Sequence, residues 1–221
     1  MTKLEHLKDQ SIKTDGYYIQ TRHEMLKFIP QNAGKILDVG CGEGQFGLQL
    51  KQLLNAEVWG MELDEKSAKV AESRIDKVLI GDLTLKIDSL PNEYFDCIIF
   101  NDILEHLVDP YNTLLNIKQK LNRDGVVVSS IPNVRYISNL KKLLFDKDWK
   151  YEDEGILDKT HLRFFTKKSI IDMFELLGFD IIQMEGINPS KSKNLKLANF
   201  LLMGNLEDTK YLQYASVTKP K

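Results

Sequence analysis

The fold is decided by one stretch, Lys35-Ile36-Leu37-Asp38-Val39-Gly40-Cys41-Gly42-Glu43-Gly44. A short apolar run that ends in glycines predicts a buried β-strand followed by a tight turn. Directly after it, Phe46, Leu50, Leu53 and Leu54 recur at helical spacing. The stretch therefore predicts a strand, a glycine turn and a helix in immediate succession.

Outward from this unit, apolar runs of strand length alternate with helix-period segments. Further strands are expected at 57–62, 78–80, 95–100, 126–131, 179–184 and 213–218. Asp64 and Thr166 are placed to cap two of the intervening helices. Pro110 is placed to open a third, which is expected to include Leu121 and to end over 122–125. This alternation is typical of an α/β protein with a parallel sheet.

Length and composition set broad limits. The 221 residues suit one domain, 1–221, with an N-terminal helical segment at 1–30 and an irregular insertion at 133–165. The net charge of −2 gives no basic face, so no nucleic-acid partner is expected. No apolar run reaches the roughly 20 residues of a membrane span. With only two cysteines and no signal peptide, we expect a cytoplasmic protein with reduced thiols. Oligomeric state cannot be predicted.

The glycine turn is a candidate ligand site. A strand-to-helix turn presents backbone N–H groups at the carboxyl edge of a parallel sheet. Gly40, Gly42 and Gly44 would let the backbone approach a ligand closely. Alone, the turn predicts only a nucleotide-like ligand, because the spacing of Gly42, Gly44 and Gly47 also fits a dinucleotide fingerprint.

Three acidic residues narrow the choice of ligand. Asp38 precedes the turn, where it would repel a diphosphate but accept a hydrogen bond from an ammonium group. Glu62 ends the second strand, where a carboxylate can bind both ribose hydroxyls. Asp82 follows the third strand and can accept from an adenine amino group, while Leu83 packs on the ring. Together they indicate S-adenosylmethionine (SAM), which is cationic and has no diphosphate.

At this point the chain resembles the class I SAM-dependent methyltransferases, through residues 36–44 and the order of Glu62, Asp82 and 95–101. The resemblance covers about residues 30 to 135. It implies a Rossmann-like, doubly wound, mostly parallel sheet of seven strands whose last strand is antiparallel. It also implies a set of cofactor-binding residues: Asp38, Gly40, Gly42, Gly44, Glu62, Leu63, Asp82, Leu83 and Asn101.

Arg22 has two interpretations. In many relatives an arginine before the first strand reaches the methionine carboxylate of SAM, and Arg22 could do this. It could equally be an ordinary exposed helix arginine.

Two segments in the second half suggest the kind of acceptor. Residues 101–110 resemble a segment of ubiquinone-pathway O-methyltransferases, and residues 156–166 resemble one in bacterial methyltransferases linked to surface glycans. These resemblances imply O-methylation of a small-molecule or glycan-precursor hydroxyl. The insertion at 133–165 is the candidate acceptor lid. Its aromatic residues, such as Trp149 and Tyr151, could stack on an acceptor or form a small core of their own.

The candidate catalytic residues are His106 and His161, one in each of these segments. A histidine can take the proton of a hydroxyl acceptor near neutral pH. A less favoured alternative is a divalent metal site formed by Asp102, Glu105, His106 and His161, because Glu-x-x-Glu-His segments bind metal in some relatives. Here Asp102 replaces the first glutamate.

Two other functions remain open. One is a SAM-binding partner or sensor without turnover. The other is a reductase that binds NAD or a nucleotide sugar, disfavoured by Asp38 and by the missing Tyr-x-x-x-Lys motif.

Overall fold

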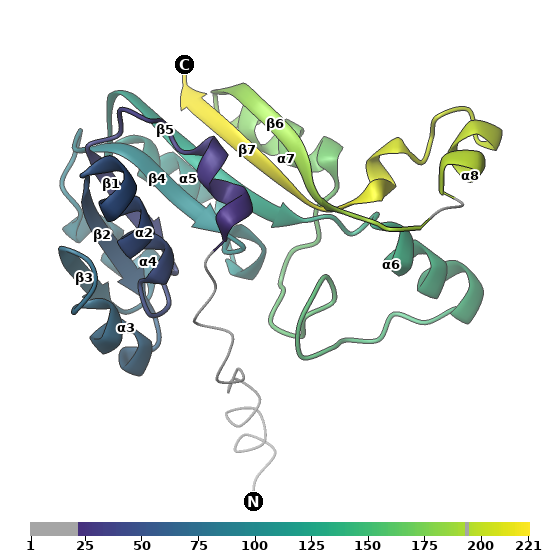
Figure 1. Ribbon diagram of the computed structural model, residues 1–221, viewed down its shortest axis with the longest axis horizontal. Helices are drawn as coiled ribbons and strands as arrows, with labels where there is room; N and C mark the ends of the chain where they lie inside the picture. Colours follow the sequence, from purple (N-terminus) through teal and green to yellow (C-terminus); the bar gives the residue numbers. More distant parts are fainter. Residues whose placement is uncertain (1–21, 193–194) are drawn as a thin grey trace, which may run out of the picture.

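The computed structural model describes residues 22–192 and 195–221 of the chain. Its framework is one seven-stranded sheet in the order β3-β2-β1-β4-β5-β7-β6 (Figure 1). The strands are β1 (Lys35–Val39), β2 (Glu57–Glu62), β3 (Lys77–Ile80), β4 (Phe95–Asn101), β5 (Leu121–Pro132), β6 (Phe179–Pro189) and β7 (Tyr211–Pro220). Strand β7 is antiparallel to both of its neighbours, β5 and β6, whereas the other pairs are parallel. The expected seven-stranded sheet with an antiparallel last strand is confirmed.

Helices cover both faces of the sheet. They are η3 (His23–Phe28), α2 (Gln45–Leu54), α3 (Glu65–Ala71), α4 (Leu83–Lys86), η4 (Ile87–Ser89), η5 (Leu104–His106), α5 (Pro110–Lys118), α6 (Ile137–Lys141), η6 (Lys142–Asp146), α7 (Lys167–Leu176), α8 (Leu195–Leu201) and η7 (Glu207–Lys210). One buried cluster joins the sheet to η3, α2 and α3, and a second joins it to α4, α5 and α7. Alternate residues of β4 belong to the two clusters. Ile98 and Phe100 pack on one face of the sheet, and Cys97 and Ile99 pack on the other.

The helix starts follow the sequence prediction. The carboxylate of Asp64 accepts from the Ser67 N–H at 2.8 Å at the start of α3. Thr166 and Ser169 form a reciprocal capping box at the start of α7. Pro110 is the first residue of α5. These caps fix where each helix leaves the sheet.

The end of α5 was predicted wrongly. The helix stops at Lys118, and Leu121 is the first residue of β5 instead of a helix residue. Leu121 is buried and pairs with Phe95, while a register shift in the β4–β5 pairing follows. Residues 122–125, expected to end the helix, therefore belong to the strand. The strands at the far edge are also longer than the predicted 179–184 and 213–218.

The insertion at 133–165 lies at the end of the molecule away from β3 (Figure 1). Within it, α6 runs directly into a π-helical turn, η6, and irregular chain follows. The insertion returns to the sheet where the Val134 N–H donates to the Phe165 carbonyl at 2.8 Å. Of the N-terminal helical segment expected at 1–30, residues 23–28 form a 3-10 helix and residues 1–21 lie outside the described residues. No helix in the described part of the chain is long and apolar enough to cross a membrane.

Candidate functional site

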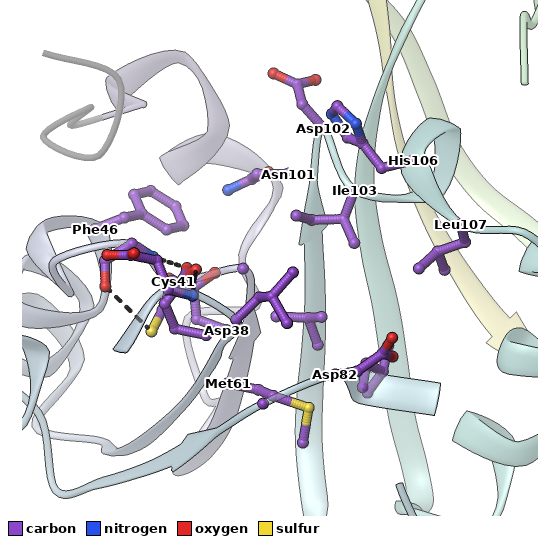
Figure 2. A pocket seen from close by; sticks show the side chains of 18 of the residues that line it. Asp38, Cys41, Phe46, Met61, Asp82, Asn101, Asp102, Ile103, His106 and Leu107 are labelled. Carbon is purple, nitrogen blue, oxygen red and sulfur yellow. Dashed lines mark hydrogen bonds between the residues drawn. The ribbon is translucent and has the colours of Figure 1, made fainter. Parts of the chain in front are cut away.

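A cavity of about 620 Å³ opens at the carboxyl ends of β1, β2 and β4, which is where ligands bind in sheets of this kind (Figure 2). All but one of the predicted cofactor-binding residues line it: Arg22, Asp38, Gly40, Gly42, Glu62, Leu63, Asp82, Leu83 and Asn101. The exception is Gly44. Sequence reasoning missed several apolar lining residues as ligand contacts, among them Phe46, Met61, Ile103 and Leu107. Apolar spacing identified Phe46 only as a core residue, since the same spacing serves both roles.

The glycine turn requires glycine at three positions. Gly40, Gly42 and Gly44 have φ values of 71°, 54° and 75°, which side chains disfavour. A Cβ on Gly40 would overlap the side chain of Ile103, across the cavity wall. A Cβ on Gly44 would lie 3.0 Å from the Cβ of Ala71, so this glycine brings α2 against α3. Its role is therefore packing and the start of α2.

Glu62 holds the turn as well as facing the cavity. Its Oε2 accepts from the Gly42 N–H at 2.8 Å, and its Oε1 accepts from the Asp64 N–H at 2.8 Å. Each carboxylate oxygen keeps further lone-pair capacity that two ribose hydroxyls could use. The glutamate is thus pre-positioned by the backbone on both sides.

Asp38 is a buried acid in a cavity that suits a cation. It is 3% exposed. Burial, followed by the negative charge of Glu62, raises the pKa of Asp38 to about 7, while Arg22 acts in the opposite direction. A positive group bound in the cavity would favour the ionised carboxylate.

Asp82 and the end of β4 offer further polar atoms to the cavity. Asp82 is exposed and caps α4, where its Oδ1 accepts from the Thr84 N–H and hydroxyl, both at 2.7 Å. It therefore has a structural role beside the predicted one. Leu83 is buried beneath the cavity. The side-chain oxygen of Asn101 is buried without a hydrogen-bond partner among the described residues, so a bound ligand could donate to it.

Arg22 lies at the cavity wall and is not an exposed helix arginine. It precedes η3, and its side chain is 11% exposed. Its Nε donates to Glu24 and its Nη2 to the Ser130 hydroxyl, both at 2.9 Å, and its Nη1 forms an ion pair with Asp102. The interpretation as an exposed arginine is wrong, because these partners hold the guanidinium between β4 and β5.

The two candidate catalytic histidines meet, although His161 follows His106 by 55 positions in the chain. Their ring centroids are 4.6 Å apart. The end of the insertion docks on η5, because the N–H groups of Leu162 and Arg163 both donate to the Glu105 carbonyl, at 2.9 and 3.0 Å. The docking brings the histidine of the insertion to the histidine that follows β4.

Backbone carbonyls fix both imidazole rings. Nδ1 of His106 lies 3.2 Å from the Thr160 carbonyl, and Nδ1 of His161 lies 2.9 Å from the Ile156 carbonyl. A carbonyl can only accept, so these contacts favour the tautomer that has its proton on Nδ1 and its lone pair on Nε2. Thr160 and Ile156 belong to the segment 156–166. Their contacts with the rings are made by backbone carbonyls, so their side chains could not predict them.

A second cavity, of about 280 Å³, adjoins the first. The two cavities share Arg22, Asp102 and His106 in their walls, and His161 lines only the second. The neighbouring aromatic rings of the insertion pack on one another, since Trp149 and Phe164 have centroids 5.2 Å apart and Tyr151 and Phe164 6.3 Å. They contact one another, but Tyr151 is 53% exposed and the other two rings are only partly buried, so the group is not a buried core.

Three of the four residues of the suggested metal site converge. Single ligand atoms of Glu105, His106 and His161 lie within 4.8 Å of one another. Asp102 is not part of this group, because its carboxylate binds Arg22, the Ser130 hydroxyl at 3.0 Å and the Gln213 amide at 2.7 Å. The structure therefore brings three of these four residues together and leaves Asp102 outside the group.

Comparison with known proteins identifies the family. Residues 12–184 match the model of a methyltransferase domain, so the chain belongs to this methyltransferase family. The chain is 28% identical over 160 residues to an uncharacterized protein of Methanocaldococcus jannaschii, a match that spans 71% of this chain and 69% of that protein. It is 22% identical over 165 residues to the ubiquinone biosynthesis O-methyltransferase of Cereibacter sphaeroides, spanning 72% of this chain and 65% of that enzyme.

Solved structures of other proteins have the same fold as this chain. A SAM-dependent methyltransferase from Archaeoglobus fulgidus superposes with a TM-score of 0.65 at 22% identity, covering 89% of this chain and 91% of that one. A possible histamine N-methyltransferase from Thermotoga maritima gives a TM-score of 0.62 at 17% identity, covering 92% and 89%. With the family match, the fold identifies the protein as a SAM-dependent class I methyltransferase.

Proposed function

We propose that this methyltransferase transfers the methyl group of SAM to a hydroxyl of a small molecule or glycan precursor held in the second cavity. The observation that carries the proposal is the position of His106, which lines both cavities. A group at this shared wall can reach the acceptor hydroxyl while the cofactor fills the larger cavity. The O-methyltransferase from Cereibacter sphaeroides supports a hydroxyl acceptor by similarity.

Each cofactor contact has a proposed partner in the larger cavity. Asp38 and the side-chain oxygen of Asn101 would accept from the ammonium group, and Arg22 would bind the carboxylate. Glu62 would accept from the ribose hydroxyls, and Asp82 from the adenine amino group. The remaining predicted residues provide close approach or apolar contact: Gly40, Gly42, Leu63 and Leu83.

The chemistry is an in-line displacement. The acceptor oxygen forms a bond to the methyl carbon, the carbon–sulfur bond breaks, and sulfur keeps its electron pair. The hydroxyl proton moves to Nε2 of His106. The tautomer suits this role. The Thr160 hydroxyl donates to Asp158 at 2.7 Å, so the Nδ1–H of His106 faces the carbonyl and hydroxyl oxygens of Thr160 as acceptors. His161 would help to orient this ring and the acceptor.

A divalent cation is the alternative means of activating the acceptor. Two imidazoles and one carboxylate, from His106, His161 and Glu105, are a donor set that suits Zn²⁺ and related ions. The carbonyls that bind each Nδ1 would orient both rings for coordination through Nε2. When bound, the ion would lower the pKa of a coordinated hydroxyl.

An acceptor screen tests the proposal. Phenolic, catecholic and sugar hydroxyls would be offered with SAM, with and without EDTA, and S-adenosylhomocysteine formation measured. His106→Ala and His161→Ala should each lower kcat, by about 10²-fold for His106, and change SAM affinity less than twofold. The exposed residue His23 gives the matched control, His23→Ala. An unchanged rate in both variants refutes the role of the histidines, and unchanged turnover in EDTA refutes the metal.

A further inference from the structure

Asp102 has an unusual backbone conformation at the wall shared by the two cavities. It follows β4 with a φ of 56°, the left-handed region, which costs a non-glycine residue about 1 kcal/mol. Its N–H donates to the Ser130 carbonyl at 3.0 Å. In Figure 2 its side chain points away from Asp38. The surrounding structure therefore turns this carboxylate toward the wall.

The Asp102 carboxylate accepts hydrogen bonds from three separate elements. Its Oδ1 accepts from the Ser130 hydroxyl of β5 at 3.0 Å and from the Gln213 amide of β7 at 2.7 Å. Its Oδ2 pairs with Nη1 of Arg22, which precedes η3. These contacts hold both oxygens in place, so the carboxylate is a fixed anchor for the guanidinium.

Arg22 is correspondingly constrained. Its three nitrogens each have a partner: Glu24 for Nε, Asp102 for Nη1 and Ser130 for Nη2. Burial alone would lower the pKa of Arg22, but the charges and hydrogen bonds of Asp102 and then Glu24 raise it above its ordinary value. A guanidinium carries five N–H groups, so two remain for a ligand, in a fixed plane.

The cofactor makes such a cation necessary. SAM carries a carboxylate, and the cavity already contains the carboxylates of Asp38, Glu62 and Asp82. Among the described residues that line this cavity, Arg22 is the only lysine or arginine. Because Glu24 and Asp102 both offset its charge, its contribution to recognition depends on where its remaining N–H groups point.

We propose that Asp102 is a positioning residue, which holds Arg22 so that its two remaining N–H groups face the carboxylate of the cofactor. The proposal rests on the role of Arg22 proposed above. It also assigns Asp102 a function different from metal binding, at the same position after β4.

The test compares two cofactor analogues that differ by one group. S-adenosylhomocysteine carries the carboxylate, and decarboxylated S-adenosylhomocysteine lacks only that group. Asp102→Asn keeps the shape of the side chain but removes its charge. It should weaken binding of S-adenosylhomocysteine by about tenfold, which corresponds to about 1.4 kcal/mol. Binding of the decarboxylated analogue should change less than twofold. A merely structural defect would weaken both ligands alike.

Controls separate this inference from the role of Arg22 itself. In an Arg22→Ala background, Asp102→Asn should cause no further loss, because the two residues act as one unit. If Asp102→Asn does not fold, Ser130→Ala removes a bond to each partner and should shift the same ratio by about threefold. Equal weakening of both analogues, or of neither, overturns the positioning role. If Arg22→Ala leaves the preference for S-adenosylhomocysteine over its decarboxylated analogue unchanged, the role proposed for Arg22, on which this inference rests, is refuted.

Discussion

Replacing Gly40 with alanine should damage both the fold and the cofactor cavity. Gly40 has a φ of 71°, and a Cβ there would overlap Cδ1 of Ile103 and lie 3.0 Å from its Cγ1. The left-handed backbone costs alanine about 1 kcal/mol, and moving Ile103 off its rotamer costs about 1 kcal/mol more. A loss of about 2 kcal/mol should lower Tm by about 4–8 °C in a chain of this size. Because Ile103 lines the cavity, its displacement should also weaken SAM binding, by about tenfold.

The assay combines denaturant unfolding with calorimetric titration of SAM. The matched control is Gly204→Ala, because Gly204 has a φ of 85° and a Cβ at this position would have no neighbouring atom within 4 Å. This control should lose about 1 kcal/mol and keep its SAM affinity. Adding Ile103→Val to Gly40→Ala removes the overlapping methyl and should restore part of both quantities. If Gly40→Ala is no worse than Gly204→Ala and binds SAM normally, the account of the turn is wrong.

Three further predictions concern buried titratable groups. Because the pKa of Asp38 is about 7 and a cationic ligand favours its ionised form, SAM affinity should fall by about tenfold per pH unit below pH 7; Asp38→Asn should flatten this profile in calorimetry. The folded-state pKa of Asp38 lies above its ordinary value of 3.8, so the protein becomes less stable as pH rises from about 4 to 7 and this buried carboxyl ionises. At pH 8 the Asp38→Asn variant should therefore resist urea better than the unaltered protein does. Burial raises the pKa of both thiols, Cys41 and Cys97, so iodoacetamide should label them slowly in the native protein and rapidly in denaturant, as mass spectrometry would detect.

Sequence reasoning predicted which residues would line the larger cavity, because these residues follow strand ends. Asp38, Glu62 and Asp82 lie at or just beyond the ends of three parallel strands, and such ends meet at one edge of the sheet. Chain order alone was therefore sufficient to bring them together. The antiparallel direction of the last strand was predicted only through the family resemblance. The position of β7 between β5 and β6 was not predicted, since strand order leaves no local trace in composition.

The acceptor side depended on contacts that leave no side-chain signature. The approach of His161 to His106 rests on backbone N–H groups that bind the Glu105 carbonyl. Any residue could supply these bonds, so the sequence could suggest the docking but not its geometry. Asp102 was grouped with the metal ligands by spacing, whereas its positive φ directs it to Arg22.

Ligand titration distinguishes a methyl-donor site from a dinucleotide site in the larger cavity. Calorimetry of the purified protein with SAM, S-adenosylhomocysteine and NAD should give one site per chain for the first two and no binding of NAD. The Glu62→Gln variant should weaken both adenosyl ligands, because Glu62 lines the cavity and supports the glycine turn. Tight binding of NAD, with neither SAM nor S-adenosylhomocysteine bound, would contradict the assignment of this cavity to the methyl donor.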